Sequence, residues 1–295
     1  MPESPSRPAP EAQVAATSAG PVQFATAGEG PPVLVVHGSP GGYDQGAIMA
    51  RWLVAAGRRA IIPSRPGYLG TELGERGAID AQADLHAALL DHLGIDRVAV
   101  LCWSGGGPSS YRLAVRHPER VSGLVALAAV SQPIQRPKEG LDDRLMFGTS
   151  VGEWLLRAMA AHAPKQLIGA TLGAEGDLSK AELKERVAGV FADPDKRDFV
   201  LDLALTVTYD GRREGLDNDW ERFGAIDSLE LERVATPTLL VHGSVDTDVP
   251  PGHSQHALDA IPGAERLVLD GGTHLAFFTH PDAEAAQARA LGVLG

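Results

Sequence analysis

Short apolar runs alternate along the chain with segments in which apolar residues recur at helical spacing. The apolar runs lie at 33–36, 60–62, 98–101, 124–130, 238–241 and 267–269. Such alternation is typical of a mostly parallel β-sheet that helices cover on both faces. We therefore predict an α/β fold with a central, mostly parallel sheet.

This alternation stops after residue 130, and helical patterns replace the apolar runs. Ser179 and Glu182 have the spacing of a capping box, and Asp193 followed by Pro194 is typical of another helix start. Residues 1–20 are rich in Pro, Ala and Ser and lack the apolar core of a signal peptide. We predict a disordered tail at 1–20, a core at 21–130 and 234–295, and a helical lid at 131–233.

A glycine-rich turn follows the apolar run at 98–101 and precedes a helical pattern. Ser104 lies at its centre, with Cys102 two residues before it and Gly106 two residues after it. A sharp strand-to-helix turn exposes the side chain at its tip when small residues flank that side chain. Ser104 is therefore a candidate nucleophile. Cys102 stands where glycine is more usual, and we expect its side chain to fill space in the core.

Two later segments place a carboxylate and an imidazole after predicted strands. Asp246 follows the run at 238–241, and His274 follows the run at 267–269. A serine hydroxyl needs a base to take its proton, and the ordinary pKa of imidazole, ~6.5, is close to neutrality. A carboxylate on the far ring nitrogen fixes the tautomer of that imidazole. We predict His274 as the base and Asp246 as its partner, with Asp248 as the alternative.

The glycine-rich loop at 37–42 follows the first apolar run. Backbone N–H groups in such a loop can stabilise the negative charge that develops on an attacked carbonyl. Pro40 has no N–H, so the donor in this loop is Ser39 or Gly41. We favour Ser39, together with the N–H of Gly105, as the oxyanion hole.

Together these segments resemble the α/β-hydrolase superfamily over roughly residues 22–294. The loop at 37–42 is similar to the family's H-G-x-P-G loop, and 65–71 is similar to its R-P-G-Y-G-x-S stretch. The segments 210–220 and 236–243 also resemble a large group of bacterial hydrolases. The resemblance implies the α/β-hydrolase fold with a helical lid, and it implies no particular substrate.

The resemblance also suggests roles for individual residues. Ser104, Asp246 and His274 match the family's nucleophile, acid and base in chain order. They imply a carboxylesterase-like serine hydrolase that cleaves an ester or related acyl bond through an acyl-serine. The residue before the nucleophile usually lies near the pocket floor in this fold, so Trp103 is a candidate substrate-binding residue, as is Trp154 of the lid. Other candidates for a pocket lining are Met146, Phe147, Leu155, Met159 and Phe191.

Composition and charge limit the classes of molecule that we expect this protein to bind. The 295-residue chain has a net charge of −12 and no basic run, which argues against nucleic acid and anionic membranes as partners. It has no apolar stretch of about 18 residues, and its one cysteine cannot form an intramolecular disulfide. His253 and His256 alone are a weak indication of a metal. We expect a small-molecule substrate, a cytoplasmic location, no cofactor and no metal, and the sequence predicts no oligomeric state.

Other activities share the same pattern. Family branches with an aspartate nucleophile, such as haloalkane dehalogenases, are disfavoured by Ser104. A prolyl-type aminopeptidase needs carboxylates for a substrate ammonium, and Glu153 and 217–219 could supply them. A lyase that uses the same triad and a ligand-binding protein without turnover also remain open.

Overall fold

One eight-stranded sheet organises the protein in this computed structural model, which describes residues 9–138 and 140–295. The strand order is β1-β2-β4-β3-β5-β6-β7-β8. β2 runs antiparallel to β1 and β4, and the other pairs are parallel. The strands are β1 (Gln13–Thr17), β2 (Gly20–Ala27), β3 (Pro32–Val36), β4 (Arg59–Pro63), β5 (Val98–Trp103), β6 (Val121–Leu127), β7 (Thr238–Gly243) and β8 (Glu265–Leu269). The predicted mostly parallel sheet is confirmed.

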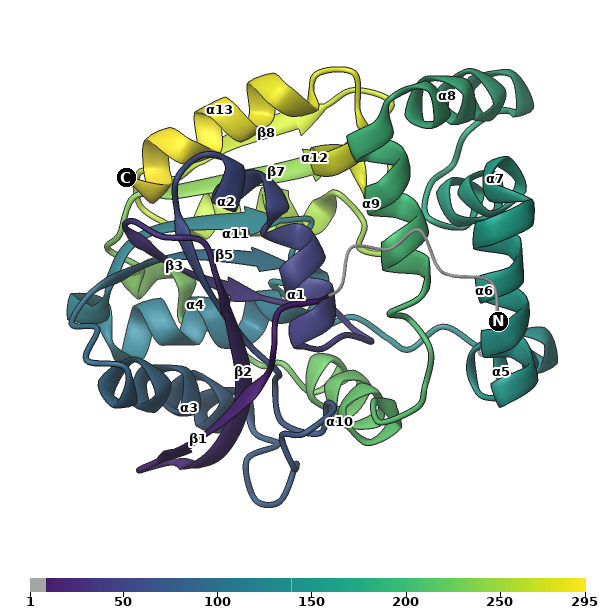
Figure 1. Cartoon of the computed structure of the whole chain (residues 1–295). Coiled ribbons are helices and arrows are strands. Elements are labelled where there is room, and N and C mark those ends of the chain that lie inside the picture. The colour runs from purple at the N-terminus through teal and green to yellow at the C-terminus, as the bar shows by residue number, and fades with distance from the viewer. Residues whose placement is uncertain (1–8, 139) are drawn as a thin grey trace.

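Helices cover both faces of this sheet. The core helices are α1 (Tyr43–Met49), α2 (Arg51–Ala55), α3 (Ile79–His92), α4 (Gly107–Arg116), α11 (Gly252–Ala260), α12 (Ala276–Thr279) and α13 (Ala283–Leu294). In Figure 1, α2 and α13 lie on one side of the sheet, and α3 and α4 lie on the other. Val33 and Val35 of β3 pack into one apolar core, whereas Leu34 and Val36 pack into the other. Burial on both faces explains why this strand is apolar throughout.

The chain between β6 and β7 is helical. Its helices are α5 (Leu141–Phe147), α6 (Ser150–His162), α7 (Pro164–Ala174), α8 (Lys180–Ala192), α9 (Pro194–Ala204) and α10 (Arg213–Gly224). Ser179 and Glu182 form the predicted capping box of α8, and the Asp193 side chain caps α9 just before Pro194. Helices α5 to α8 form a layer of their own beside the sheet domain (Figure 1).

The predicted extent of the disordered tail is wrong. The expected tail at 1–20 contains β1 and the start of β2, while residues 1–8 lie outside the described residues. β1 is an edge strand that buries Ala15 and leaves Val14 63% exposed, so it lacks the apolar run by which strands are recognised. The apolar run at 124–130 extends past its strand: β6 ends at Leu127, and Ala128, with a φ of +42°, begins the buried segment that follows.

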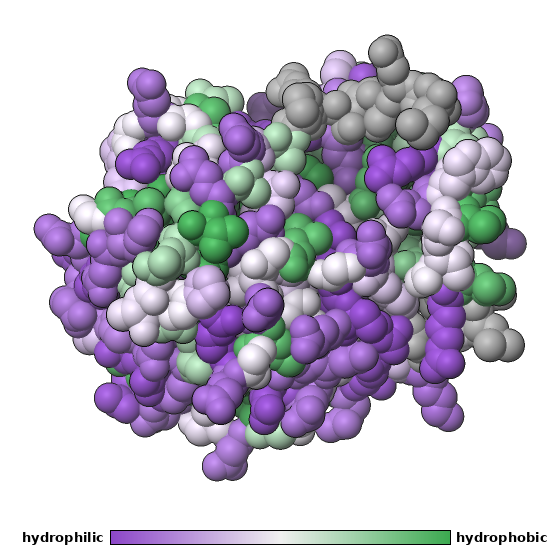
Figure 2. Space-filling model, turned by 60° about the horizontal axis from the view of Figure 1, so that its bottom comes forward, coloured by the Kyte–Doolittle hydropathy of each residue, from purple (hydrophilic) through white to green (hydrophobic). Residues whose placement is uncertain are grey.

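The surface carries little contiguous apolar area on the side seen in Figure 2, where hydrophobic residues form small groups among hydrophilic ones. A helix long and apolar enough to cross a membrane does not occur within the described residues.

Candidate active site

Ser104 lies at the tip of the turn between β5 and α4. Its φ of +53° is in the left-handed region, where a residue other than glycine is strained, as is typical of a nucleophile on a sharp turn. Gly106 makes the turn possible, because a Cβ there would lie 2.7 Å from the His37 carbonyl oxygen. Cys102 is fully buried, and burial raises the pKa of its thiol to about 12. That thiol is therefore neutral near pH 7, as expected for a space-filling side chain.

Asp246 and His274 meet after β7 and β8. His274 Nδ1 lies 2.8 Å from Asp246 Oδ2, and both side chains are buried. The other carboxylate oxygen of Asp246 accepts the N–H groups of Asp248 and Val249 at 2.9 and 3.0 Å. The carboxylate is thus fixed from both sides, and the geometry favours Asp246 over Asp248 as the partner of His274. Within the described residues no hydrogen bond joins Ser104 to His274, and such bonds are often long until substrate binds.

The electrostatics of this pair favour its charged form. Burial alone would lower the pKa of His274, but Asp246, with further help from Asp248 and Glu175, raises it to about 9. Burial opposes ionisation of Asp246 as well, yet His274 and His242 hold the pKa of that carboxyl well below its ordinary value. The pair is therefore an imidazolium and a carboxylate near neutral pH.

A lid segment that we did not predict as part of the site lies against these loops. Gly176 forms a β-bridge with Asp246, and the main-chain oxygen of Glu175 accepts the N–H of His274 at 3.1 Å. The Glu175 Oε2 atom is buried and has no hydrogen-bond partner among the described residues. Burial and the nearby Asp248 carboxyl raise the pKa of Glu175 to about 8, and burial also raises the pKa of Asp248.

The two residues predicted for the oxyanion hole lie side by side. A Cβ placed on Gly105 would be 2.1 Å from Ser39 Oγ, so only glycine fits against this loop. His37 shapes the loop from within, because its Nε2 accepts the Arg65 N–H at 2.9 Å while its Nδ1 lies 2.7 Å from the Gly38 carbonyl oxygen. Burial and the Arg65 charge lower the pKa of His37 well below its ordinary value, which keeps this imidazole neutral.

The Ser39 side chain is part of a buried polar network. Its hydroxyl donates to Asp219 Oδ2 at 2.5 Å and accepts from Arg65 Nη2 at 2.9 Å. Arg65 also binds both carboxylate oxygens of Asp219, at 2.8 and 2.7 Å, and the Tyr68 hydroxyl donates to the same carboxylate at 2.5 Å. Asp219 belongs to the lid helix α10, so this network joins the lid to the loop after β3.

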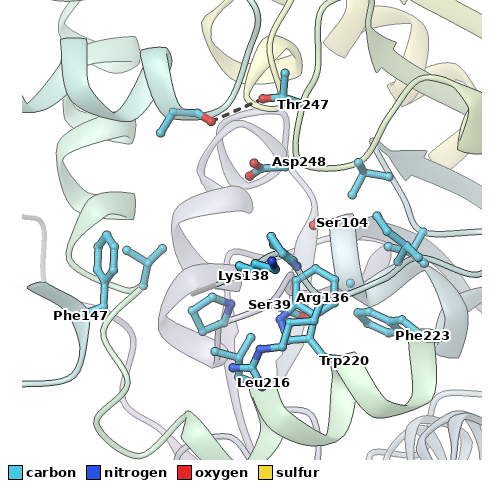
Figure 3. A pocket seen from close by; sticks show the side chains of 18 of the residues that line it. Ser39, Ser104, Arg136, Lys138, Phe147, Leu216, Trp220, Phe223, Thr247 and Asp248 are labelled. Atoms are coloured by element: carbon cyan, nitrogen blue, oxygen red, sulfur yellow. Dashed lines mark hydrogen bonds between the residues drawn. The ribbon is translucent and has the colours of Figure 1, made fainter. Parts of the chain in front are cut away.

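A cavity of about 550 Å³ opens between the lid and the core beside Ser104, Ser39 and Gly105. Figure 3 shows that Trp220, Phe223 and Leu216 of α10 form one wall of it, with Asp248 on another side. The remaining lining residues are Pro40, Val130, Ile134, Arg136, Pro137, Lys138, Phe147, Ala174, Val207, Tyr209, Thr247 and Val249. The volume suits a small organic molecule.

Neither tryptophan predicted to bind substrate lines this cavity. Trp154 is 65% exposed, because α6 buries the face that carries Gly152, Leu156 and Ala160 and turns Trp154 the other way. Trp103 is buried, with its ring 5.1 Å from the His274 ring and its Nε1 3.4 Å from the His274 carbonyl oxygen. It therefore supports the predicted base rather than the substrate.

Of the other residues predicted to line a pocket, one lies at the cavity and four do not. Phe147 lines the cavity, whereas Met146, Met159 and Phe191 pack against the apolar core and Leu155 is 39% exposed.

The carboxylates considered for a substrate ammonium all have basic partners. Glu153 pairs with Arg157, and Asp219 pairs with Arg65. Asp217 pairs with Arg136 and Arg213.

The two histidines weighed as metal ligands have other contacts. Nδ1 of His253 accepts the Ser131 N–H, and His256 faces the Ser131 hydroxyl. Among the described residues, no cluster of three or more His, Cys, Asp or Glu side chains could hold a metal ion.

Comparison with known proteins places this site in a family. A family model described as alpha/beta hydrolase fold matches residues 31–281. The solved alpha/beta hydrolase fold protein from Nakamurella multipartita is 52% identical, with a TM-score of 0.94 over 96% of this chain and 99% of that one. The uncharacterized hydrolase YcgS of Bacillus subtilis is 27% identical over 280 residues, which are 90% of this chain and 92% of that protein. A 2-hydroxy-6-oxo-6-phenylhexa-2,4-dienoate hydrolase of Burkholderia cepacia is 26% identical over 271 residues, covering 87% of this chain and 86% of that enzyme.

The chain belongs to the α/β-hydrolase fold family. Its full-length relatives include proteins named as hydrolases, so the predicted fold and family are confirmed.

Proposed function

We propose that this protein is a serine hydrolase that cleaves a carboxylic ester or related acyl bond of a small molecule through an acyl-serine intermediate. The observation that carries the proposal is the buried Asp246–His274 pair after β7 and β8, whose imidazole ring lies 5.1 Å from the ring of Trp103, the residue before the strained Ser104. A serine that opens into a cavity next to such a pair is the arrangement that acyl transfer requires.

The proposed reaction has two halves. Ser104 Oγ attacks the substrate carbonyl while His274 takes the hydroxyl proton, and the N–H groups of Ser39 and Gly105 stabilise the oxyanion. Collapse of this intermediate breaks the bond to the leaving group, which receives the proton from His274. Water then adds to the acyl-serine by the same route and releases the acid. Asp246 stays ionised throughout and holds the imidazole in position.

The cavity supports a substrate with an apolar or aromatic group. Its walls carry Phe147, Trp220 and Phe223, together with Val130 and Ile134. A volume of about 550 Å³ accommodates an acyl or aryl group of moderate size rather than a polymer. We propose no cofactor for this chemistry, because every step above uses only water and the side chains and backbone N–H groups of this chain. The cytoplasmic location remains a prediction.

Intact-protein mass after incubation with a fluorophosphonate tests the proposal. We expect one adduct on the wild type and on Cys102→Ala, and none on Ser104→Ala, because only an activated serine reacts rapidly. Esters of increasing acyl length then define the preferred chain. A wild type that neither forms an adduct nor hydrolyses any ester would contradict the proposal and favour a ligand-binding protein. Conversion of substrate without hydrolysis would favour a lyase.

A further inference from the structure

Three sequence segments come together at a place that the proposed reaction leaves unexplained. Arg65 and Tyr68 belong to the R-P-G-Y stretch after β4, Asp219 lies on the lid helix α10, and Ser39 lies in the loop after β3. Arg65 and Asp219 are each 1% exposed, so their ion pair is separated from solvent. The side chains of Arg65, Tyr68 and Asp219 do not line the cavity, whereas Ser39 does.

The Asp219 carboxylate is saturated by the groups around it. Oδ1 accepts from Arg65, and Oδ2 accepts from Arg65, Tyr68 and Ser39. Of these donors, only Ser39 is also a proposed oxyanion residue. The carboxylate therefore fixes the Ser39 side chain, and with it the backbone that carries the Ser39 N–H.

The same helix also touches the second oxyanion residue. Phe223, one turn after Asp219 on α10, has its Cζ atom 3.1 Å from the position that a Cβ on Gly105 would occupy. One face of α10 therefore meets both Ser39 and Gly105, through a hydrogen bond at one and close packing at the other. The lid helix and the proposed oxyanion hole form one continuous contact.

We propose that Asp219 is a positioning residue that couples the lid to the oxyanion hole: it holds Ser39 in the orientation at which the Ser39 N–H meets the developing negative charge. This inference rests on the proposed function. Asp219 does not touch substrate, and its influence passes through Ser39. An oxyanion hole matters most when charge has developed on the carbonyl oxygen. Loss of Asp219 is therefore expected to reduce stabilisation of the transition state much more than binding of the ester.

The test compares Asp219→Asn with Asp202→Asn. Asp202 is a matched control, since it is a buried lid carboxylate on α9 that pairs with Arg51 and lies outside the active-site cavity. For each folded variant, kcat and KM are measured with a p-nitrophenyl ester, together with the affinity for a trifluoromethyl ketone that forms an oxyanion on Ser104. We expect Asp219→Asn to lower kcat by about tenfold to 10²-fold with little change in KM, and to weaken the ketone in parallel, whereas the control retains wild-type values.

Two further variants protect this test against misfolding. Ser39→Ala and Tyr68→Phe each remove one donor to Asp219 and keep the ion pair with Arg65. We expect both variants to lose kcat and ketone affinity together, and the loss to be larger for Ser39→Ala because this change acts directly on the oxyanion loop. If Asp219→Asn does not fold, unchanged kcat and ketone affinity in both of these variants would overturn the proposed role of Asp219.

The outcomes separate this inference from the proposed function. An active wild type whose Asp219→Asn variant keeps its kcat and ketone affinity would overturn the role of Asp219 alone. So would an equal weakening of ester and ketone, which indicates a damaged cavity. A wild type without Ser104-dependent activity or ketone binding would overturn both.

Discussion

The two sides of the proposed active site are held in different ways. On the acid–base side, the lid contributes Glu175, whose main chain binds His274, and three carboxyl groups surround one imidazole. On the oxyanion side, the lid contributes Asp219, which forms a buried ion pair with Arg65. On the acid–base side, the pKa values of His274 and Glu175 lie within the pH range of an activity assay. The oxyanion side consists instead of an arginine and its carboxylate partner.

This difference separates the effects of pH from the effects of packing. A change of pH between 7 and 10 changes the protonation of His274, whose pKa is raised to about 9, and of Glu175, whose pKa is raised to about 8. The Arg65–Asp219 pair responds instead to substitution, because removal of one buried partner leaves the other charge uncompensated. Each side can therefore be disturbed while the other stays intact.

The largest effect is expected from the carboxylate that orients the base. Asp246→Asn should lower kcat by about 10⁴-fold, because the amide favours the wrong tautomer of His274. Asp248→Asn is the matched control, and we expect a much smaller loss since Asp248 makes no hydrogen bond to His274 among the described contacts. Steady-state kinetics with one ester checks both. Loss of activity in Asp248→Asn with an active Asp246→Asn would reverse the assignment.

The oxyanion side should respond to one added methyl group. Gly105→Ala places a Cβ 2.1 Å from Ser39 Oγ and 3.1 Å from Phe223 Cζ, so the loop and α10 must move. We expect kcat to fall by about 10²-fold, as when one oxyanion donor is lost.

Gly189→Ala is the control for this change, because it is a helical position with open space around it. It should keep its activity and gain about 0.5–1 kcal/mol in free energy of unfolding. Equal activity of the two alanine variants would exclude the proposed hole.

The acid–base side should control the pH profile. His274 must be neutral to act as a base, and its pKa is raised to about 9, so kcat/KM should fall as the pH drops through about 9 and level off above it. Glu175→Gln removes one carboxyl that favours the imidazolium, so this limb should move to lower pH. Asp177→Asn, two residues further along the lid, should leave the limb in place. A limb that does not move in Glu175→Gln would remove Glu175 from the electrostatics of the site.

The smallest effect is expected from the aromatic wall of the cavity, compared with the outer face of the lid. Trp220 lines the cavity, whereas Trp154 is 65% exposed on α6. Trp220→Ala should raise KM by about tenfold for an aromatic ester, through lost apolar contact. Trp154→Ala should leave KM unchanged. A larger rise of KM in Trp154→Ala would mean that substrate contacts the outer face of the lid.

Local patterns in the sequence predicted the sheet, the turn of Ser104 and the loops that carry Asp246 and His274, because each pattern is set by neighbours a few residues away. The role of Glu175 could not be predicted in this way, since its contact with His274 depends on the path of the whole lid. The sequence indicates Asp219 only as a possible ligand for an ammonium, because its partner Arg65 lies 154 positions away. Trp154 was misplaced because the helical pattern of α6 did not reveal which of its faces is buried.

Acyl transfer to Ser104 can be tested with a carbamate, because carbamoyl-serines hydrolyse slowly and the intermediate accumulates. A p-nitrophenyl carbamate is incubated with wild type and Ser104→Ala, released nitrophenol is counted, and digested protein is mapped by mass. We expect one equivalent of nitrophenol and a carbamoyl group on Ser104 with the wild type, and neither with the variant. Absence of nitrophenol release from the wild type, or a carbamoyl group on any other residue, would contradict acyl transfer to Ser104.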